Sequence, residues 1–145
     1  MLENVSSPEN ALIQSESELV FKFQYDPEEQ LIELICDYWD LRPDANRAFI
    51  EFKFTGVSRF NSKGDMSIKY PHLDVHNELE SASRKVEYGI LFINLNFRNG
   101  KSVSFQAEGM FARARHARVV RRDAEFDYFD LESGKKFEFE HPFTS

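Results

Sequence analysis

The sequence has little cysteine, glycine and proline, and no long apolar run. Its 145 residues include 1 Cys, 6 Gly and 5 Pro, which excludes collagen-like and low-complexity chains. The single cysteine, Cys36, cannot form a disulfide within the chain, so we expect a reducing, cytoplasmic environment. The longest aliphatic and aromatic run, Ile90–Ile93, is far shorter than the roughly 20 apolar residues of a membrane helix. The amino terminus lacks the basic and apolar regions of a secretory signal, and no membrane partner is expected.

Aromatic and charged residues are abundant. The chain contains 15 Phe, 5 Tyr and 1 Trp, which can fill a hydrophobic core without a disulfide or a metal. Its 25 acidic and 18 basic side chains give a formal net charge of -7. Because residues 1–18 are rich in Ser, Glu and Asn, we predict a mobile amino-terminal arm there, followed by one β-rich domain over residues 19–145.

Alternation of apolar and polar residues predicts β-strands along most of the chain. The segments 19–25 and 31–39 alternate in this way and are joined by the turn residues 26–30, which predicts a hairpin. Asn99-Gly100 favours a second hairpin with a two-residue turn, because both residues accept the positive φ of a type I′ turn. Residues 71–85 are polar and are expected to be irregular. The other predicted strands cover 47–54, 66–70, 86–97, 102–108, 125–131 and 135–140.

Residues 110–122 form the one segment whose spacing predicts a helix. Met110 and Ala114 would share one face of this helix, whereas Arg115 and Arg118 would share another. We therefore predict a mainly β fold, either an antiparallel β-sandwich or a strongly curved sheet, with about eight strands and one short helix near 110–122.

Sequence motifs for catalysis or cofactor binding are missing from this chain. No nucleophile-elbow serine or dinucleotide fingerprint is present, and residues 99–102 lack the first glycine of a phosphate-binding loop. Cys36 is expected to face the interior, where a thiol behaves as a small hydrophobic group. His72, Asp74 and His76 would share one side of an extended strand, but no fourth ligand accompanies them, so a metal site stays an alternative. We therefore expect no enzyme activity, catalytic residue, metal or cofactor.

A run of arginines is the strongest basic feature of the chain. It could contact phosphate, but an acidic chain is not typical of a nucleic-acid-binding domain, and Asp127 and Asp130 follow as internal partners. Nucleic acid is therefore not an expected partner. Two alternatives stay open: a second contact surface, or a helix face neutralised by internal salt bridges. The arginines are Arg113, Arg115, Arg118, Arg121 and Arg122.

Acidic side chains gather around the first predicted hairpin and the loop after it, beside the only tryptophan. Such a surface attracts a cationic partner and offers aromatic anchors at its centre. We predict a partner-binding surface here; the alternative is a core tryptophan at a strand end with ordinary solvated acids. The predicted surface consists of Glu28, Glu29, Asp37, Tyr38, Trp39, Asp40 and Asp44.

A series of strand and turn residues extends through the chain from Tyr25 to Gly109. The series comprises Tyr25-Asp26, Leu31-Ile32-Glu33-Leu34, Asp37-Tyr38-Trp39, Phe52-Lys53-Phe54-Thr55-Gly56-Val57, Phe60 and Gly100-Lys101-Ser102-Val103-Ser104-Phe105-Gln106-Ala107-Glu108-Gly109. In its order, the series resembles small bacterial β-domains of uncharacterised or immunity type, which accompany polymorphic and contact-dependent toxins. The resemblance covers about residues 19–110 and consists of scaffold residues, so it brings no catalytic position to this chain.

The resemblance implies an immunity protein that binds a cognate bacterial toxin, such as a basic toxin domain, and neutralises it. The acidity agrees with this expectation, because carboxylates can mimic the phosphates that a nuclease toxin binds. One alternative is an adaptor or structural component of a larger bacterial or phage assembly. A further alternative is a ligand binder or enzyme with a pocket inside the curved sheet. The sequence makes no prediction of oligomeric state.

The net charge is unevenly distributed along the chain. Residues 1–44 carry 2 basic and 11 acidic side chains, residues 45–122 carry 14 and 7, and residues 123–145 carry 2 and 7. The acidic ends can therefore neutralise the basic middle segment. The charges left for a partner depend on how the three segments fold together.

Overall fold

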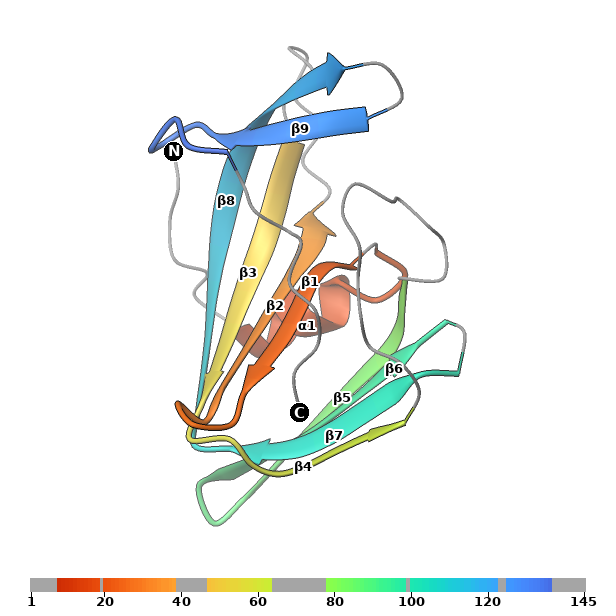
Figure 1. Cartoon of the computed structure of the whole chain (residues 1–145). Helices are drawn as coiled ribbons and strands as arrows, with labels where there is room; N and C mark the ends of the chain where they lie inside the picture. Colours follow the sequence, from red (N-terminus) through yellow and green to blue (C-terminus); the bar gives the residue numbers. More distant parts are fainter. Residues whose placement is uncertain are drawn as a thin grey trace.

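The computed structural model describes residues 8–18, 20–38, 47–63, 78–98, 100–122 and 125–136. Within these ranges it contains one short helix and nine strands in two antiparallel sheets (Figure 1). The predicted mainly β, antiparallel fold is therefore confirmed. The elements are α1 (Pro8–Gln14), β1 (Val20–Asp26), β2 (Leu31–Tyr38), β3 (Arg47–Thr55), β4 (Ser58–Lys63), β5 (Leu79–Glu87), β6 (Ile90–Phe97), β7 (Ser102–Ala107), β8 (Gly109–Arg122) and β9 (Glu125–Asp130).

The first sheet has the strand order β1-β2-β3-β8-β9 and curls into a half-barrel. The predicted hairpin of β1 and β2 is confirmed, with Asp26 opposite Leu31 beside its turn. Successive side chains of a strand point to opposite faces, so alternate residues face the interior. The inward residues of β2 are Ile32, Leu34 and Cys36, which lie opposite Phe54, Phe52 and Ile50 of β3.

The second sheet, in the order β4-β7-β6-β5, packs against the inward face of the first. Phenylalanines from both sheets fill the space between them, and the rings of Phe54 and Phe105 meet edge to face at 5.0 Å. The ring of Phe60 on β4 stacks on Tyr25 of β1 with 4.2 Å between centroids. These contacts join the two sheets into one core.

A second aromatic cluster lies on the opposite face of the first sheet. An irregularity in β1 between Val20 and Lys22 turns Phe21 away from the main core. The Phe21 ring lies 4.9 Å from Phe49 and 5.7 Å from Tyr128, between centroids. All three side chains are buried, so β9 is attached to the sheet by aromatic packing as well as by backbone pairing.

The helix predicted near 110–122 is wrong, because this segment is the long strand β8. It pairs with β3 on one side and with β9 on the other. Met110, Ala112 and Ala114 face the core, whereas Arg113 and Arg115 face away. Side chains that alternate between two faces in this way are typical of a strand. Alanine and arginine favour helices locally, and pairing with distant strands outweighs this weak preference.

Two strands occupy segments that were not expected to be strands. The polar residues of β5 lie in the segment predicted to be irregular, and β4 follows the expected break at Gly56. Both are edge strands, which need few buried side chains, and β5 buries only Leu79 fully. The segment predicted as one strand over 86–97 divides between β5 and β6. The predicted strand 66–70 and residues 137–140 lie outside the described residues.

The hairpin of β6 and β7 has a longer loop than predicted. The Phe97 N–H donates to the Lys101 carbonyl at 2.7 Å, so three residues lie between these two positions. Gly100 donates its N–H to the Phe97 carbonyl at 3.1 Å and has a φ of 84°. This arrangement is that of a three-residue hairpin loop with glycine in the left-handed region.

Within the segment predicted as an amino-terminal arm, residues 1–18, α1 packs Ala11 and Leu12 into the core. The backbone of Leu79 on β5 pairs with Ser17 and Glu18 at 2.6 and 2.9 Å. Residues 1–7 lie outside the described residues. No helix in the described ranges is long and apolar enough to cross a membrane.

Candidate functional site

The fold divides the predicted acidic surface. Glu28 and Glu29 are exposed in the turn between β1 and β2, whereas Asp37 lies near the other end of β2. A strand rises about 3.3 Å per residue, so Asp37 lies roughly 20 Å from this turn. Among the described residues, the acids of the first hairpin therefore do not form one cluster. Tyr38 is the last residue of β2, and Trp39, Asp40 and Asp44 lie outside the described residues.

Glu28 and Glu29 belong instead to a surface built from four short connections at one end of the molecule. These connections join β1 to β2, β3 to β4, β5 to β6 and β7 to β8, and they lie toward the lower left in Figure 1. We name this surface the turn end. It consists of residues 26–30, 56–59, 85–89 and 108.

Backbone hydrogen bonds hold the connections of the turn end together. The Val57 N–H donates to the Gln30 carbonyl at 2.9 Å, which joins the first connection to the second. The Glu108 N–H donates to the Thr55 carbonyl, also at 2.9 Å, which adds the fourth. The pairing of β6 with β7 places the tip of the β5–β6 hairpin at the same end. Hydrogen bonds therefore link three of the four connections, and sheet pairing places the fourth at the same end.

The turn end is acidic. Its carboxylates are Asp26, Glu28, Glu29, Glu87 and Glu108, against the cations Lys85 and Arg59. The Asp26 carboxylate accepts the backbone N–H groups of Glu28 and Glu29 at 3.1 and 3.2 Å and so fixes their turn. Within the described part of the chain, Glu28, Glu29 and Glu108 make no ion pair, whereas Glu87 pairs with Lys85 at 2.8 Å. Unpaired exposed carboxylates attract cationic partners over several ångströms.

Exposed apolar side chains accompany these acids. Of the large hydrophobic residues that are exposed in the described ranges, Tyr88 is the most exposed, at 103%. Val86, two residues earlier on β5, is 47% exposed. Phe111, near the start of β8, is 60% exposed. An aromatic side chain surrounded by charges is typical of the centre of a protein interface.

Tyr88 and Gly89 form the two-residue turn between β5 and β6, with φ values of 53° and 77°. A type I′ turn requires positive φ at both positions, which favours Asn or Gly. Tyrosine is bulky and adopts this conformation at a cost. Gln30 and Arg59 also have positive φ, so three of the four such non-glycine residues among those described lie in the turn end. Unfavourable backbone conformations often cluster at functional sites.

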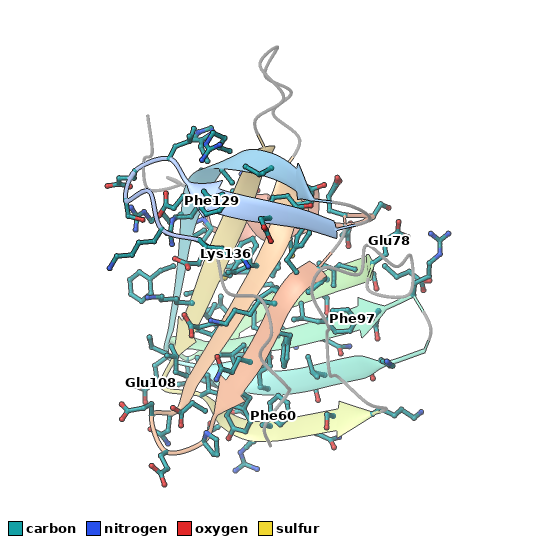
Figure 2. All side chains as sticks on the ribbon, turned by 45° about the horizontal axis from the view of Figure 1, so that its top comes forward. Phe60, Glu78, Phe97, Glu108, Phe129 and Lys136 are labelled. Atoms are coloured by element: carbon teal, nitrogen blue, oxygen red, sulfur yellow. The ribbon has the colours of Figure 1, made fainter. Side chains whose placement is uncertain are left out.

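Gly56 is required by the geometry of the turn end. Its φ is 59°, and a Cβ placed on it would lie 2.7 Å from the side chain of Glu108. The Glu108 side chain therefore lies directly across the backbone of Gly56. Figure 2 shows Glu108 at this end of the molecule, away from Phe129 and Lys136.

The predicted basic residues lie on β8, and those whose side chains are described contact other parts of the fold. Arg113 pairs with Glu132 at 2.6 Å, and the Arg118 guanidinium lies over the Phe129 ring at 5.3 Å from its centroid. Arg115 pairs with Glu51 of β3 at 3.2 Å and with Asp130 of β9. The ion pairs of Arg113 and Arg115 agree with the alternative of internal salt bridges, whereas Arg118 contacts only an aromatic ring among the described residues. Arg121 and Arg122 are the last residues of β8.

Asp130 is the most buried acid of this network. Burial alone would raise the pKa of its carboxyl group, but hydrogen bonds from Arg115 and from the Glu132 N–H, with the Arg115 charge, lower it overall. The Glu132 N–H donates to Asp130 at 3.0 Å. Asp130 therefore stays ionised and holds β9 against β8.

Cys36 lies fully buried in the core, as predicted. Burial strongly raises the pKa of its thiol, and the charges of Asp37 and Glu18 raise it further. Because the thiolate is the reactive form, Cys36 is a structural residue. The possible metal ligands His72, Asp74 and His76 lie outside the described residues, and no metal-binding group occurs within them.

Comparison of the chain with protein-family models, with curated proteins and with solved structures finds no match. The resemblance to small bacterial immunity-type domains therefore stays a prediction.

Sequence reasoning missed Tyr88 and Glu108 as members of this surface. Residues 86–97 were predicted as a single strand, although Tyr88-Gly89 lies between two apolar runs and is compatible with a two-residue turn. Glu108 gave no local signal, because only the pairing of β3 with β8 brings it beside Gly56.

Proposed function

We propose that this protein is a non-catalytic protein-binding domain whose turn end docks onto a positively charged partner protein. One observation carries the proposal: Tyr88 is fully exposed at the apex of a hairpin, in a backbone conformation that disfavours tyrosine. An exposed tyrosine is the type of anchor that contributes most to protein interfaces.

The position of Tyr88 has no explanation in folding stability. With 103% exposure its side chain buries no area. A non-glycine residue in the left-handed region costs roughly 1 kcal/mol, and asparagine or glycine would suit the turn better. A residue that is unfavourable for its backbone conformation, and whose side chain adds no packing contacts, is a candidate for a functional role.

The carboxylates of the turn end support a cationic partner. Charges around an anchor increase the rate of association and orient the partner before contact. Salt screens such exposed charges, so binding should weaken at high ionic strength. The excess of carboxylates over cations in the turn end therefore favours a basic protein surface over a neutral one.

The resemblance to immunity-type domains makes a cognate bacterial toxin the expected partner. A toxin that acts on nucleic acid presents cations to phosphate, and the turn end would cover these cations with Glu28, Glu29 and Glu108. The protein would then act by occlusion and would need no catalytic residue.

Photocrosslinking in the source cells tests this proposal. A photoreactive phenylalanine derivative replaces Tyr88, and in a matched control it replaces Asn94, an exposed residue of β6 outside the turn end. We expect a basic protein to crosslink from position 88 and not from position 94. The yield should fall when Glu28, Glu29 and Glu108 are changed together to lysine.

Two results would contradict the proposal. Equal crosslinking from positions 88 and 94 would show that the turn end is not the contact. Crosslinks from position 88 to other copies of this chain alone would instead favour the alternative of a structural component in an assembly.

A further inference from the structure

A hollow of about 350 Å³ lies on the second sheet, at the end opposite the turn end. The end of β4, the start of β5 and the β6–β7 hairpin contribute residues to it. Figure 2 shows Phe97 and Glu78 at this end, away from Glu108. The volume is within the lower range of small-ligand sites, which begins at roughly 300 Å³.

The register of the second sheet builds the floor of this hollow. Four polar residues lie side by side across the strands, in the order Lys63, Ser102, Asn96 and Ser81. The side-chain amide of Asn96 donates to the Ser81 hydroxyl at 3.0 Å. This contact fixes the amide orientation and leaves its carbonyl oxygen to accept a hydrogen bond from a ligand.

Two of the cations that line the hollow have no carboxylate partner among the described residues. These two cations are Lys63 and Lys101. By contrast, Arg98, which also lines the hollow, is paired with Glu78. The hollow is therefore a positive site on an acidic protein.

The two sides of the hollow differ in chemistry. Lys63 on β4 and Lys101 beside β7 supply positive charge, whereas Glu80 on β5 supplies a carboxylate. Strands are about 4.8 Å apart, so β4 and β5 lie roughly 14 Å from each other across the sheet. An anionic group suits the lysine side, and hydroxyl donors suit Glu80, which only accepts hydrogen bonds.

We propose that this hollow binds a small phosphorylated ligand that carries hydroxyl groups, such as a sugar phosphate. The phosphate contacts Lys63 and Lys101, and the hydroxyl groups contact Asn96, Ser81 and Glu80. Gly100 leaves open space beside the lysines, since a Cβ placed on it would meet no atom within 4 Å. This proposal is independent of the turn end, which lies at the other end of the same sheet.

Titration of the ¹⁵N-labelled full chain followed by NMR tests the proposal. The probes are glucose 6-phosphate, inorganic phosphate and glucose, each taken to millimolar concentration. We expect glucose 6-phosphate to bind most tightly and to shift the amide signals of Ser81, Asn96 and Gly100. Changing Lys63 and Lys101 together to glutamine should weaken binding on the order of tenfold, since exposed charges contribute modestly to binding.

Controls distinguish this site from unspecific attraction of anions. Lys53→Gln removes an exposed cation from the first sheet and should leave the affinity unchanged. Ser81→Ala removes a group that contacts the ligand hydroxyls, and it should weaken binding without changing net charge. The proposal is overturned if either glucose or inorganic phosphate binds as tightly as glucose 6-phosphate. It is also overturned if glucose 6-phosphate causes no saturable shift of the amide signals. Equal affinity in the double lysine variant would overturn it as well.

Discussion

Charged side chains have different surroundings in the Arg115 network and in the turn end. Arg115, Glu51 and Asp130 lie between neighbouring strands, and their side chains are 19%, 14% and 6% exposed. In the turn end, by contrast, Glu28 and Glu108 are exposed and have no cation paired with them in the described ranges. The same residue types therefore stabilise the fold in one region and are available to a partner in the other.

Removal of Arg115 should have the largest effect on stability. Arg115→Ala leaves the buried carboxylate of Asp130 without its cation, which should lower the free energy of unfolding by roughly 2–3 kcal/mol. Urea denaturation followed by tryptophan fluorescence or circular dichroism measures this change.

Two further variants sharpen the comparison. Glu28→Ala in the turn end should change the free energy of unfolding by less than about 0.5 kcal/mol, because surface substitutions have small effects. Replacing Arg115 and Asp130 together with apolar residues should restore part of the loss. If Glu28→Ala destabilises the chain as much as Arg115→Ala, the two regions do not differ in the way we describe.

Acid should weaken the fold through Asp130. The pKa of Asp130 is lower in the folded state than that of an ordinary aspartate, so the folded state binds fewer protons. Asp130 therefore contributes stability above the unfolded-state pKa, and this contribution is lost as pH falls through the folded-state pKa. Urea midpoints measured from neutral to strongly acidic pH should show a shallower loss in Asp130→Asn than in the wild type. An unchanged acid dependence would show that other groups cause the acid sensitivity.

The strands of the first sheet were predictable where apolar side chains alternate strictly. Phe52 and Phe54 have this pattern, and β3 was predicted almost to its ends. The helix prediction for β8 failed, because its alanines and arginines suit both structures and its partner strand is distant in sequence. The polar strand β5 was missed because an edge strand owes its structure to backbone pairing with β6.

The candidate site was predictable only in part, because it also depends on the pairing of strands. Glu28 and Glu29 were identified from their turn, but the acids expected beside them, such as Asp37, lie along the strand at its other end. Glu108 joins the surface through the pairing of β3 with β8, which are far apart in the chain, and Tyr88 through the pairing of β6 with β7. Local patterns show which residues are exposed, whereas the topology decides which of them share a surface.

The sharpest test of the turn end comes from Tyr88→Asn, which should cause no loss of stability. Asparagine suits the first position of a type I′ turn, and Tyr88 buries no area, so the free energy of unfolding should stay the same or rise by up to about 1 kcal/mol. Binding to the partner captured from position 88 should fall at least tenfold, because the anchor is lost. Calorimetry of both proteins with the same partner measures this affinity. If the variant is at least as stable as the wild type but binds more weakly, Tyr88 acts in binding and not in folding. Replacement of a residue with a structural role would lower both stability and affinity. Unchanged affinity would instead show that the acids of the turn end act without an aromatic anchor.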